Sequence, residues 1–286
     1  HRWGTCPPQQ LSAIALLYPF VPPLKKRRVR RCLCVRQASH VTLSNVTLSD
    51  ARGDVVRITN ADSIHITNAT VRNGGGRCVY LSGVRSSVSH SEVRGCGEHA
   101  AHLTPASTHL TTDMRCLWPS RAVLTRVCIW AGAGSDGISM YGGSFTTLTR
   151  GDLSITHNFI TDFSRWRRTY RPGLYFYGVG LYVAHNLITN APHTGVYGRC
   201  NDCLFEYNVM RRVLYETIDS GAFYVGRSWA ERGNVFQHNT IDDVRAYQRL
   251  AQTYSRQNAF YLDDQMSGWT FFNNTVINAS TAVKLG

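Results

Sequence analysis

The chain has 286 residues, a formal net charge of +13 and 43% hydrophobic residues, so it can form one large core or a long solenoid. No run of 18 uninterrupted apolar residues occurs, which leaves the sequence without a candidate transmembrane helix. The 24 glycines, together with many Asn, Thr, Ser and Val residues, favour short strands and tight turns over helices.

Residues 1–39 show no core pattern and are predicted to be an irregular basic leader outside the fold. Their charge is concentrated in the run KKRRVRR at 25–31. Such runs occur in nuclear localisation signals and nucleic-acid patches, but the motif has many false positives. We interpret it as part of the leader and expect no nucleic-acid partner. The apolar stretch 11–21 is short and lacks the layout of a cleavable signal peptide.

A repeating strand pattern begins at His40 and predicts an all-β fold. The runs HVTLSNVTL, SIHITNATV and SSVSHSEV share one alternation, and Leu43, Ile66 and Val88 recur at intervals of 23 and 22 residues. This period predicts a right-handed parallel β-helix over 40–286, because the Leu and Asn pattern of leucine-rich repeats is missing. The rhythm breaks near 98–120, which we interpret as an inserted loop.

An asparagine recurs in the later coils, three positions after an inward apolar residue. We predict a structural ladder of hydrogen-bonded side chains formed by Asn158, Asn186, Asn208, Asn239 and Asn274. His157, His185 and His238 each precede a ladder residue and resemble a metal cluster. Tyr207 and Asn273 occupy the same position in their coils, so we interpret this column as a surface stripe and expect no metal.

The nine cysteines show no zinc-finger spacing, because Cys200 and Cys203 lack a second pair of ligands. A disulfide between Cys78 and Cys96, linking neighbouring coils, is one possible pairing. Four glycosylation sequons favour the secretory route, and we therefore expect a secreted glycoprotein; they lie at Asn45, Asn68, Asn273 and Asn278.

Four segments between Tyr170 and Trp269 repeat a turn, a short strand and a polar turn. They read YRPGLYFYGVG (170–180), APHTGVYGRCND (191–202), ETIDSGAFYVGRSW (216–229) and NAFYLDDQMSGW (258–269). Adjacent coils of a parallel solenoid lie ~4.8 Å apart, so aligned residues become neighbours in space.

Alignment of these segments by their turns predicts three columns. They contain Arg171, His193, Asp219 and Arg256; then Gly178, Cys200, Gly226 and Asp263; then Val179, Asn201, Arg227 and Asp264. We therefore predict that Arg171, His193 and Asp219 line one face of three adjacent coils.

The ordered set Y-R-P-G, A-P-H, D-S-G-A and L-D-D-x-x-S-G-W, over about residues 140–280, resembles glycoside hydrolase family 141. The resemblance implies a secreted parallel β-helix with α-L-fucosidase-like or xylanase-like activity on a carbohydrate substrate, without a cofactor. It also implies two catalytic aspartates, which match Asp219 and one of Asp263 or Asp264. The chain departs from the family at Cys200, Cys203 and Ser228, where the family has Gly, His and an acidic residue.

Glycoside hydrolysis requires one carboxylic acid to protonate the leaving oxygen and a second carboxylate as nucleophile or base. Neighbouring cations would keep Asp219 ionised, whereas the adjacent Asp263 and Asp264 repel each other, so that one serves as the acid. The aromatic residues either stack on sugars or pack on the solenoid. The complete substrate-binding set is Arg171, His193, Asn201, Tyr224, Arg227, Trp229, Tyr261 and Trp269.

The alignment raises one objection to this pair. Asp219 and Asp263 lie seven positions apart along the coil, roughly 23 Å in a straight strand, whereas catalytic carboxylates sit ~5–10 Å apart. The pair requires a sharp bend or a returning loop; otherwise Glu216 or Glu206 is the partner. Two other functions stay open: a polysaccharide lyase using His193 or a Lys/Arg base, often with calcium, and a non-catalytic glycan-binding solenoid.

Overall fold

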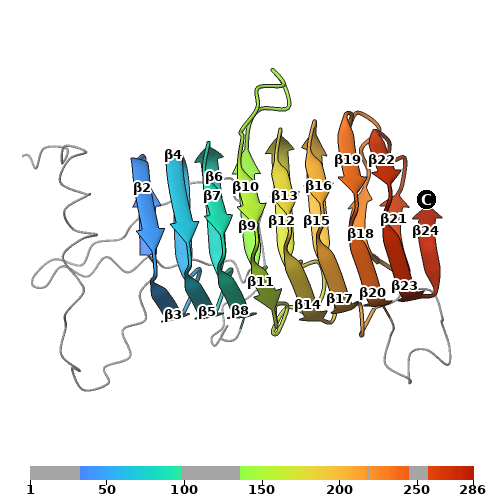
Figure 1. The fold of residues 1–286 in the computed structure, drawn as a ribbon, viewed down its shortest axis with the longest axis horizontal. Helices are drawn as coiled ribbons and strands as arrows, with labels where there is room; N and C mark the ends of the chain where they lie inside the picture. Colours follow the sequence, from blue (N-terminus) through green and yellow to red (C-terminus); the bar gives the residue numbers. More distant parts are fainter. Residues whose placement is uncertain (1–32, 98–135, 218, 245–256) are drawn as a thin grey trace, which may run out of the picture.

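A computed structural model describes residues 33–97, 136–217, 219–244 and 257–286. Within these ranges every element is a β-strand, and none is a helix long and apolar enough to cross a membrane. The strands stack along one axis from β1 to β24 (Figure 1), and their pairing is parallel throughout. The predicted right-handed parallel β-helix is confirmed.

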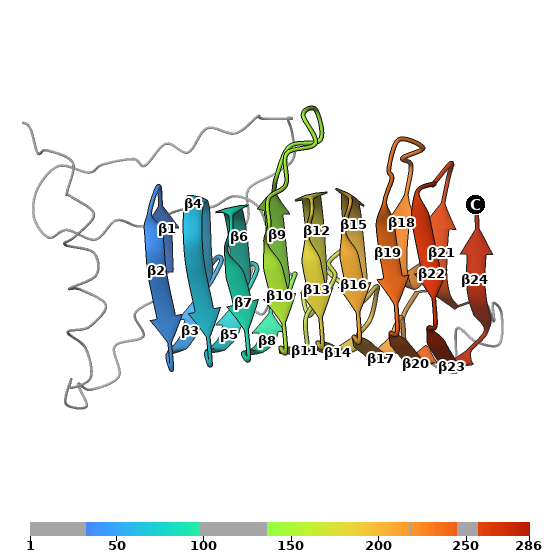
Figure 2. The same cartoon turned by 45° about the horizontal axis from the view of Figure 1, so that its top comes forward.

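Each coil contributes one strand to each of three faces (Figure 2). Face 1 contains β1 (Leu33–Arg36), the first half of β4 (Val56–Thr67), β6 (Val79–Val84), β9 (Ile138–Gly142), β12 (Leu174–Val179), β15 (Val196–Asn201), β18 (Gly221–Gly226), β21 (Asn258–Asp263) and β24 (Thr281–Leu285). Face 2 contains β2 (Ser39–Ser44), the second half of β4, β7 (Ser87–Ser89), β10 (Ser154–Thr156), β13 (Tyr182–Ala184), β16 (Leu204–Glu206), β19 (Asn234–Gln237) and β22 (Trp269–Phe272).

Face 3 is a separate sheet of eight strands. It contains β3 (Thr47–Ala51), β5 (Thr70–Gly74), β8 (Glu92–Cys96), β11 (Phe159–Thr161), β14 (Leu187–Ala191), β17 (Val209–Val213), β20 (Thr240–Val244) and β23 (Thr275–Ala279). Faces 1 and 2 form one sheet of 16 strands, because β4 runs through the corner between them.

The solenoid begins earlier than predicted. β1 starts at Leu33 and pairs with β4, so residues 33–39 belong to the first coil rather than to a leader. The alternation of exposure along Leu33–Arg36 is that of a strand, although the surrounding composition is basic. The predicted loop near 98–120 lies outside the described residues.

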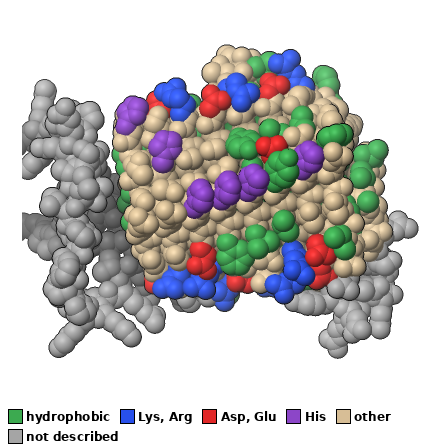
Figure 3. Space-filling model, in the orientation of Figure 1, with side chains coloured by type: hydrophobic (Ala, Val, Ile, Leu, Met, Phe, Trp, Pro, Cys, Tyr) green, Lys and Arg blue, Asp and Glu red, His purple; other side chains and the backbone are tan. Residues whose placement is uncertain are grey.

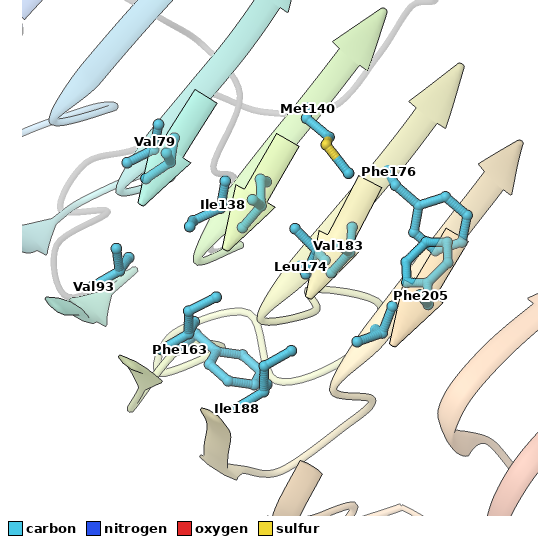
Figure 4. Close-up of a cluster of buried hydrophobic side chains, with 14 of the residues drawn as sticks. Val79, Val93, Ile138, Met140, Phe163, Leu174, Phe176, Val183, Ile188 and Phe205 are labelled. Carbon is cyan, nitrogen blue, oxygen red and sulfur yellow. The ribbon is translucent and has the colours of Figure 1, made fainter. Parts of the chain in front are cut away.

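Inward-pointing side chains from the strands fill the inside of the solenoid and form the core. Figure 4 shows Val79, Ile138 and Leu174 of face 1 pointing inward, and Phe176 and Phe205 meet with ring centroids 4.9 Å apart. All five side chains are fully buried. Strand alternation therefore separates an apolar interior from polar outer faces.

The predicted asparagine ladder is confirmed. In each coil the backbone N–H and the Nδ2 group of one asparagine donate to the Oδ1 of the next. Asn158 donates to Asn186 at 3.0 and 2.9 Å, and Asn186 donates to Asn208 at the same distances. The ladder continues through Asn239 to Asn274. It satisfies turn amides that would otherwise be buried without a partner.

The predicted disulfide between Cys78 and Cys96 is present, with Cα atoms 5.4 Å apart. Both half-cystines belong to one coil, since Cys78 precedes β6 and Cys96 ends β8. The bond therefore closes a coil rather than linking neighbouring coils.

Candidate functional site on face 1

A row of four tyrosines runs along face 1, pointing away from the interior. Strand register pairs Tyr175 with Tyr197, Tyr197 with Tyr224 and Tyr224 with Tyr261. Their ring centroids lie 5.8, 5.4 and 5.3 Å apart in that order. We call these four residues the tyrosine row. The same strand position continues to Lys284, which pairs with Tyr261 in register.

Two of the predicted catalytic aspartates contact residues at the C-terminal end of the tyrosine row. Tyr224 donates its hydroxyl to Asp263 Oδ2 at 2.6 Å, and Lys284 Nζ donates to Tyr261 Oη at 2.9 Å. Lys284 Nζ also lies 3.7 Å from Asp219 Oδ1. We call these five residues the carboxylate cluster. Its contacts connect Asp263 to Asp219 indirectly, through Tyr224, the neighbouring ring of Tyr261 and Lys284.

The electrostatics of the cluster fix which groups donate protons in hydrogen bonds. Burial, and then the hydrogen bond to Asp263, raise the pKa of Tyr224 well above its usual value, so its hydroxyl stays protonated. The hydrogen bond to Tyr261 raises the pKa of Lys284, so its ammonium group stays charged. Asp219 is the most accessible member, with 80% of its side chain exposed.

The column predicted for Asp219 is off by one residue. Val196 pairs with Phe223, which aligns His193 with Ser220, and Gly221 pairs with Asn258, which aligns Ser220 with Gln257. Asp219 therefore lies beside the column of His193 rather than in it. The predicted fourth member, Arg256, lies outside the described residues.

His193 lies beneath an exposed tyrosine at the edge of the row. The ring of Tyr170 is 4.8 Å from that of His193 and 6.3 and 6.4 Å from those of Tyr197 and Tyr224. His193 is only 2% exposed, and burial lowers its pKa to about 4, so the imidazole is neutral near pH 7. Among the described residues, its Nδ1 has no hydrogen-bond partner, and neither has the buried Nε of the preceding coil's Arg171.

Two other predicted substrate-binding residues have structural roles. Trp269 packs in the interior, 4.9 Å from Phe223 between ring centroids, and its indole N–H donates to Glu231 at 3.1 Å. Asn201 is buried and accepts a hydrogen bond from the backbone N–H of Arg232 at 2.9 Å. Core packing and the bond to Glu231 account for Trp269, and a backbone hydrogen bond accounts for Asn201.

Asp264 and Arg227 form an exposed ion pair of 3.1 Å at the turn after the face 1 strands. Asp264 is thus paired outside the carboxylate cluster, whereas Asp263 belongs to it through Tyr224. Trp229 in the same turn region is 76% exposed. The alternative partners lie elsewhere: Glu216 pairs with Arg168, and Glu206 accepts a hydrogen bond from Tyr182 on face 2.

A second carboxylate near Ser228 was not found from the sequence. Arg199 donates to Ser228 Oγ at 2.7 Å and lies 3.4 Å from Glu231, whose carboxyl is almost fully buried. Burial raises the pKa of Glu231, and hydrogen bonds from Trp269 and the Cys200 backbone oppose that rise. Glu231 is therefore a buried acidic group three residues after Ser228.

The histidine column forms a stacked surface stripe, which appears as a run of purple side chains in Figure 3. Ring centroids are 4.8 Å apart for His90 and His157, 4.6 Å for His157 and His185, and 5.1 Å for Tyr207 with either His185 or His238. No group of three or more possible metal ligands occurs among the described residues. Ring stacking along successive coils accounts for the column.

Comparisons with known proteins agree with this fold. The protein-family model for a right handed beta helix region matches residues 26–117. The A-module of the Azotobacter vinelandii mannuronan C-5 epimerase AlgE4 is similar in structure, with a TM-score of 0.51 and 9% sequence identity; the alignment covers 87% of this chain and 63% of that one. The Agl-KA catalytic domain gives a TM-score of 0.42 and 11% identity over 89% of this chain and 53% of that one. No curated protein matches the chain.

Proposed function

We propose that the protein binds a polysaccharide along face 1 and hydrolyses a glycosidic bond with Asp219 and Asp263. One observation carries this proposal: at the end of the tyrosine row, Asp219 lies 3.7 Å from Lys284, which bonds to Tyr261, and Asp263 bonds to the adjacent Tyr224. The epimerase found among the fold neighbours acts on a polysaccharide by its name, which favours a carbohydrate substrate for this surface. The family resemblance favours a fucoside or a xylan.

The contacts assign different roles to the two aspartates. Tyr224 orients Asp263 by a hydrogen bond of 2.6 Å, which suits the carboxylate that attacks the sugar or activates water. Asp219 is largely exposed and is the remaining carboxyl group for the acid that protonates the leaving oxygen, which reverses the roles expected from the sequence. Lys284 and Tyr261 keep the two groups in one place.

Exposed aromatic rings at the border of the row offer surfaces for sugar rings. Tyr170 and Tyr177 are 49% and 40% exposed, whereas Tyr224 and Tyr261 are 7% and 5% exposed. The apolar faces of sugars pack on such exposed rings. We therefore propose that the substrate contacts Tyr170 and Tyr177. The buried Tyr224 and Tyr261 instead hold Asp263 and Lys284 by hydrogen bonds.

We also propose that the protein is secreted. The Cys78–Cys96 disulfide is typical of oxidising compartments. The asparagines of all four sequons are exposed in turns or strand ends, where a glycan can be attached; they are Asn45, Asn68, Asn273 and Asn278.

A panel of glycans, including fucosides and xylan, tests the activity, with reducing ends and ultraviolet absorbance measured together. We expect new reducing ends without absorbance. Asp219→Asn and Asp263→Asn should each keep the fold and lower turnover by several orders of magnitude, because the carboxylates carry the bond-breaking steps. Asp152→Asn is the matched control, since Asp152 is an exposed aspartate bound to Arg150 at 2.9 Å. Wild-type turnover in both catalytic variants would exclude this assignment.

A second candidate function is β-elimination on a uronate polymer. It is favoured by His193, a neutral imidazole with an unpartnered Nδ1 at the edge of the row. A base would remove the proton at C5, the C4 oxygen would depart, and a C4–C5 double bond that absorbs ultraviolet light would form. Absorbance that appears with wild-type protein and vanishes in His193→Ala would favour this reaction over hydrolysis.

A further inference from the structure

A small cationic cavity opens on face 3, away from the carboxylate cluster. It has a volume of about 240 Å³ and is lined by Arg72, Asn73, Arg94, Gly95, Asp162 and Arg165. Three guanidinium groups thus face one carboxylate. Sites for drug-sized ligands occupy roughly 300–1,000 Å³, so this cavity suits a smaller ligand.

The strand register places two of these arginines directly opposite each other on neighbouring strands. Arg72 on β5 pairs directly with Arg94 on β8, and like charges in directly opposed positions destabilise a sheet. Glu92 Oε1 forms an ion pair with Nε of Arg94 at 3.1 Å, but the pair lacks hydrogen-bond geometry, and Nε has no other hydrogen-bond partner in the described part of the chain. One acidic neighbour therefore offsets only part of the paired charge.

Arg72 has a buried N–H donor that lacks an acceptor in the described part of the chain. Its Nε is sequestered from solvent and has no hydrogen-bond acceptor among the residues in the described ranges. A guanidinium cannot lose its proton in a protein, so a buried N–H of this kind needs an acceptor or costs stability. The neighbouring Asn73 is oriented by Asp50, to which its Nδ2 donates at 3.2 Å.

Gly95 opens the floor of the cavity. Its φ of +64° is in the left-handed region, and a Cβ there would lie 2.9 Å from Asn73 Oδ1 and 3.6 Å from Nη1 of Arg165. A side chain there would collide with Asn73, and the Arg165 guanidinium lies next to this glycine. Three successive coils therefore converge on one space.

We propose that this cavity binds one sulfate or phosphate oxyanion, either as a free ion or as an ester group on a glycan. Guanidinium groups bind such oxygens through paired, charge-assisted hydrogen bonds. The bound anion would accept the hydrogen bond that Arg72 Nε lacks and would offset the repulsion between Arg72 and Arg94. The proposal concerns face 3 and does not depend on the hydrolytic activity proposed for face 1.

Calorimetric titration of the full chain with sodium sulfate and sodium phosphate, at constant ionic strength set with sodium chloride, tests the site. We expect saturable binding to the wild type and at least about tenfold weaker binding to Arg72→Gln, as lost hydrogen bonds to a charged group predict. Arg72→Lys keeps the charge, removes the planar fork and should fall between them. Arg211→Gln is the matched control, because Arg211 lies on the same outer surface of face 3 and pairs with Asp242 at 3.1 Å.

Dextran sulfate and unsulfated dextran distinguish the two sources of the anion. Tighter binding of dextran sulfate per sulfate group, lost in Arg72→Gln, identifies a glycan-borne ester as the ligand. Equal affinity per group identifies the free ion. Sulfate that binds Arg72→Gln and the wild type alike, or that has no effect beyond matched sodium chloride, overturns the proposal. Circular dichroism and thermal unfolding establish that each variant is folded, and Arg72→Lys decides the question if Arg72→Gln is not.

Discussion

At the N-terminal end of face 1, Asp54 lies between two arginines, whereas at the C-terminal end Asp219 lies near Lys284 and Asp263 bonds to Tyr224. Asp54 accepts hydrogen bonds from Arg57 Nε at 3.0 Å and from the backbone N–H of Arg77 at 3.0 Å. Both guanidinium groups lie 4.4 Å from the centre of the Tyr80 ring.

Exposure separates the two ends. The side chains of Asp54 and Arg57 are each 8% exposed, but those of Asp219 and Lys284 are 80% and 42% exposed. In a buried ion cluster the charges compensate one another and are removed from solvent. The same solenoid face therefore carries a structural ion cluster at one end and accessible carboxylates at the other.

The largest expected effect on stability is that of Asp54→Asn. Removal of one partner from a buried ion cluster leaves the arginines uncompensated and should lower the free energy of unfolding by about 3–5 kcal/mol. Asp219→Asn, at the exposed end, should change it by less than about 0.5 kcal/mol. Denaturant unfolding monitored by circular dichroism measures both values. Equal losses from the two variants would remove the distinction between the two ends.

Acid should weaken the C-terminal half through His193. Its pKa is about 4 in the folded protein, against an ordinary value near 6.5, so the unfolded chain binds the proton more strongly. The stability that His193 contributes is complete above about pH 6.5 and is lost as the pH falls toward about 4, up to about 3 kcal/mol in total. Unfolding free energies from pH 7.5 to 4 should fall less steeply in His193→Gln. Parallel curves for the two proteins would contradict this account.

The turns after face 2 also differ between the two ends of the solenoid, and substitutions there should have smaller effects on stability. The Asn208 side chain accepts two hydrogen bonds from Asn186 and donates to Val183 and Asn239. The Ser91 hydroxyl in an earlier coil accepts the backbone N–H of Ala69 at 3.1 Å and donates to the Ser89 carbonyl at 2.8 Å. Asn208→Ala should cost about 2 kcal/mol and Ser91→Ala about 1 kcal/mol, because more buried groups lose their partners in the first. Thermal and denaturant unfolding distinguish the two. A greater loss of unfolding free energy for Ser91→Ala than for Asn208→Ala would contradict the expectation that the asparagine ladder stabilises its turn more than Ser91 does.

Tyr170→Ala should have the smallest effect, and on substrate binding alone. Loss of one stacking ring should raise KM by about three- to tenfold while kcat stays within about twofold, as expected for 0.5–1.5 kcal/mol of aromatic contact. Tyr207→Ala is the matched control, since Tyr207 is 48% exposed against 49% for Tyr170 but lies on the histidine stripe. A KM that rises equally in both variants would argue against the position of the substrate on face 1.

The fold and the ladder could be predicted because they depend on local repetition. Inward residues such as Leu43, Ile66 and Val88 recur once per coil, so the period is present in the sequence itself. The start at Leu33 was missed because the first strand is short and follows a basic run.

The site could be predicted only in part, because it depends on register between coils of unequal length. Val196 pairs with Phe223, a longer step than that from Leu174 to Val196, and alignment by turns therefore placed Asp219 in the column that belongs to Ser220. Lys284 was missed because it lies in the last coil, beyond the repeated glycine-containing turns.

A crystal structure of Asp219→Asn with a bound oligosaccharide, chosen as the best substrate of the wild type, tests the central claim most directly. The account predicts a sugar ring against Tyr170 and a glycosidic oxygen within hydrogen-bond reach of residue 219, with Asp263 still bound to Tyr224. An oligosaccharide bound at the Asp54 end of face 1, or on face 2 or face 3, would contradict it.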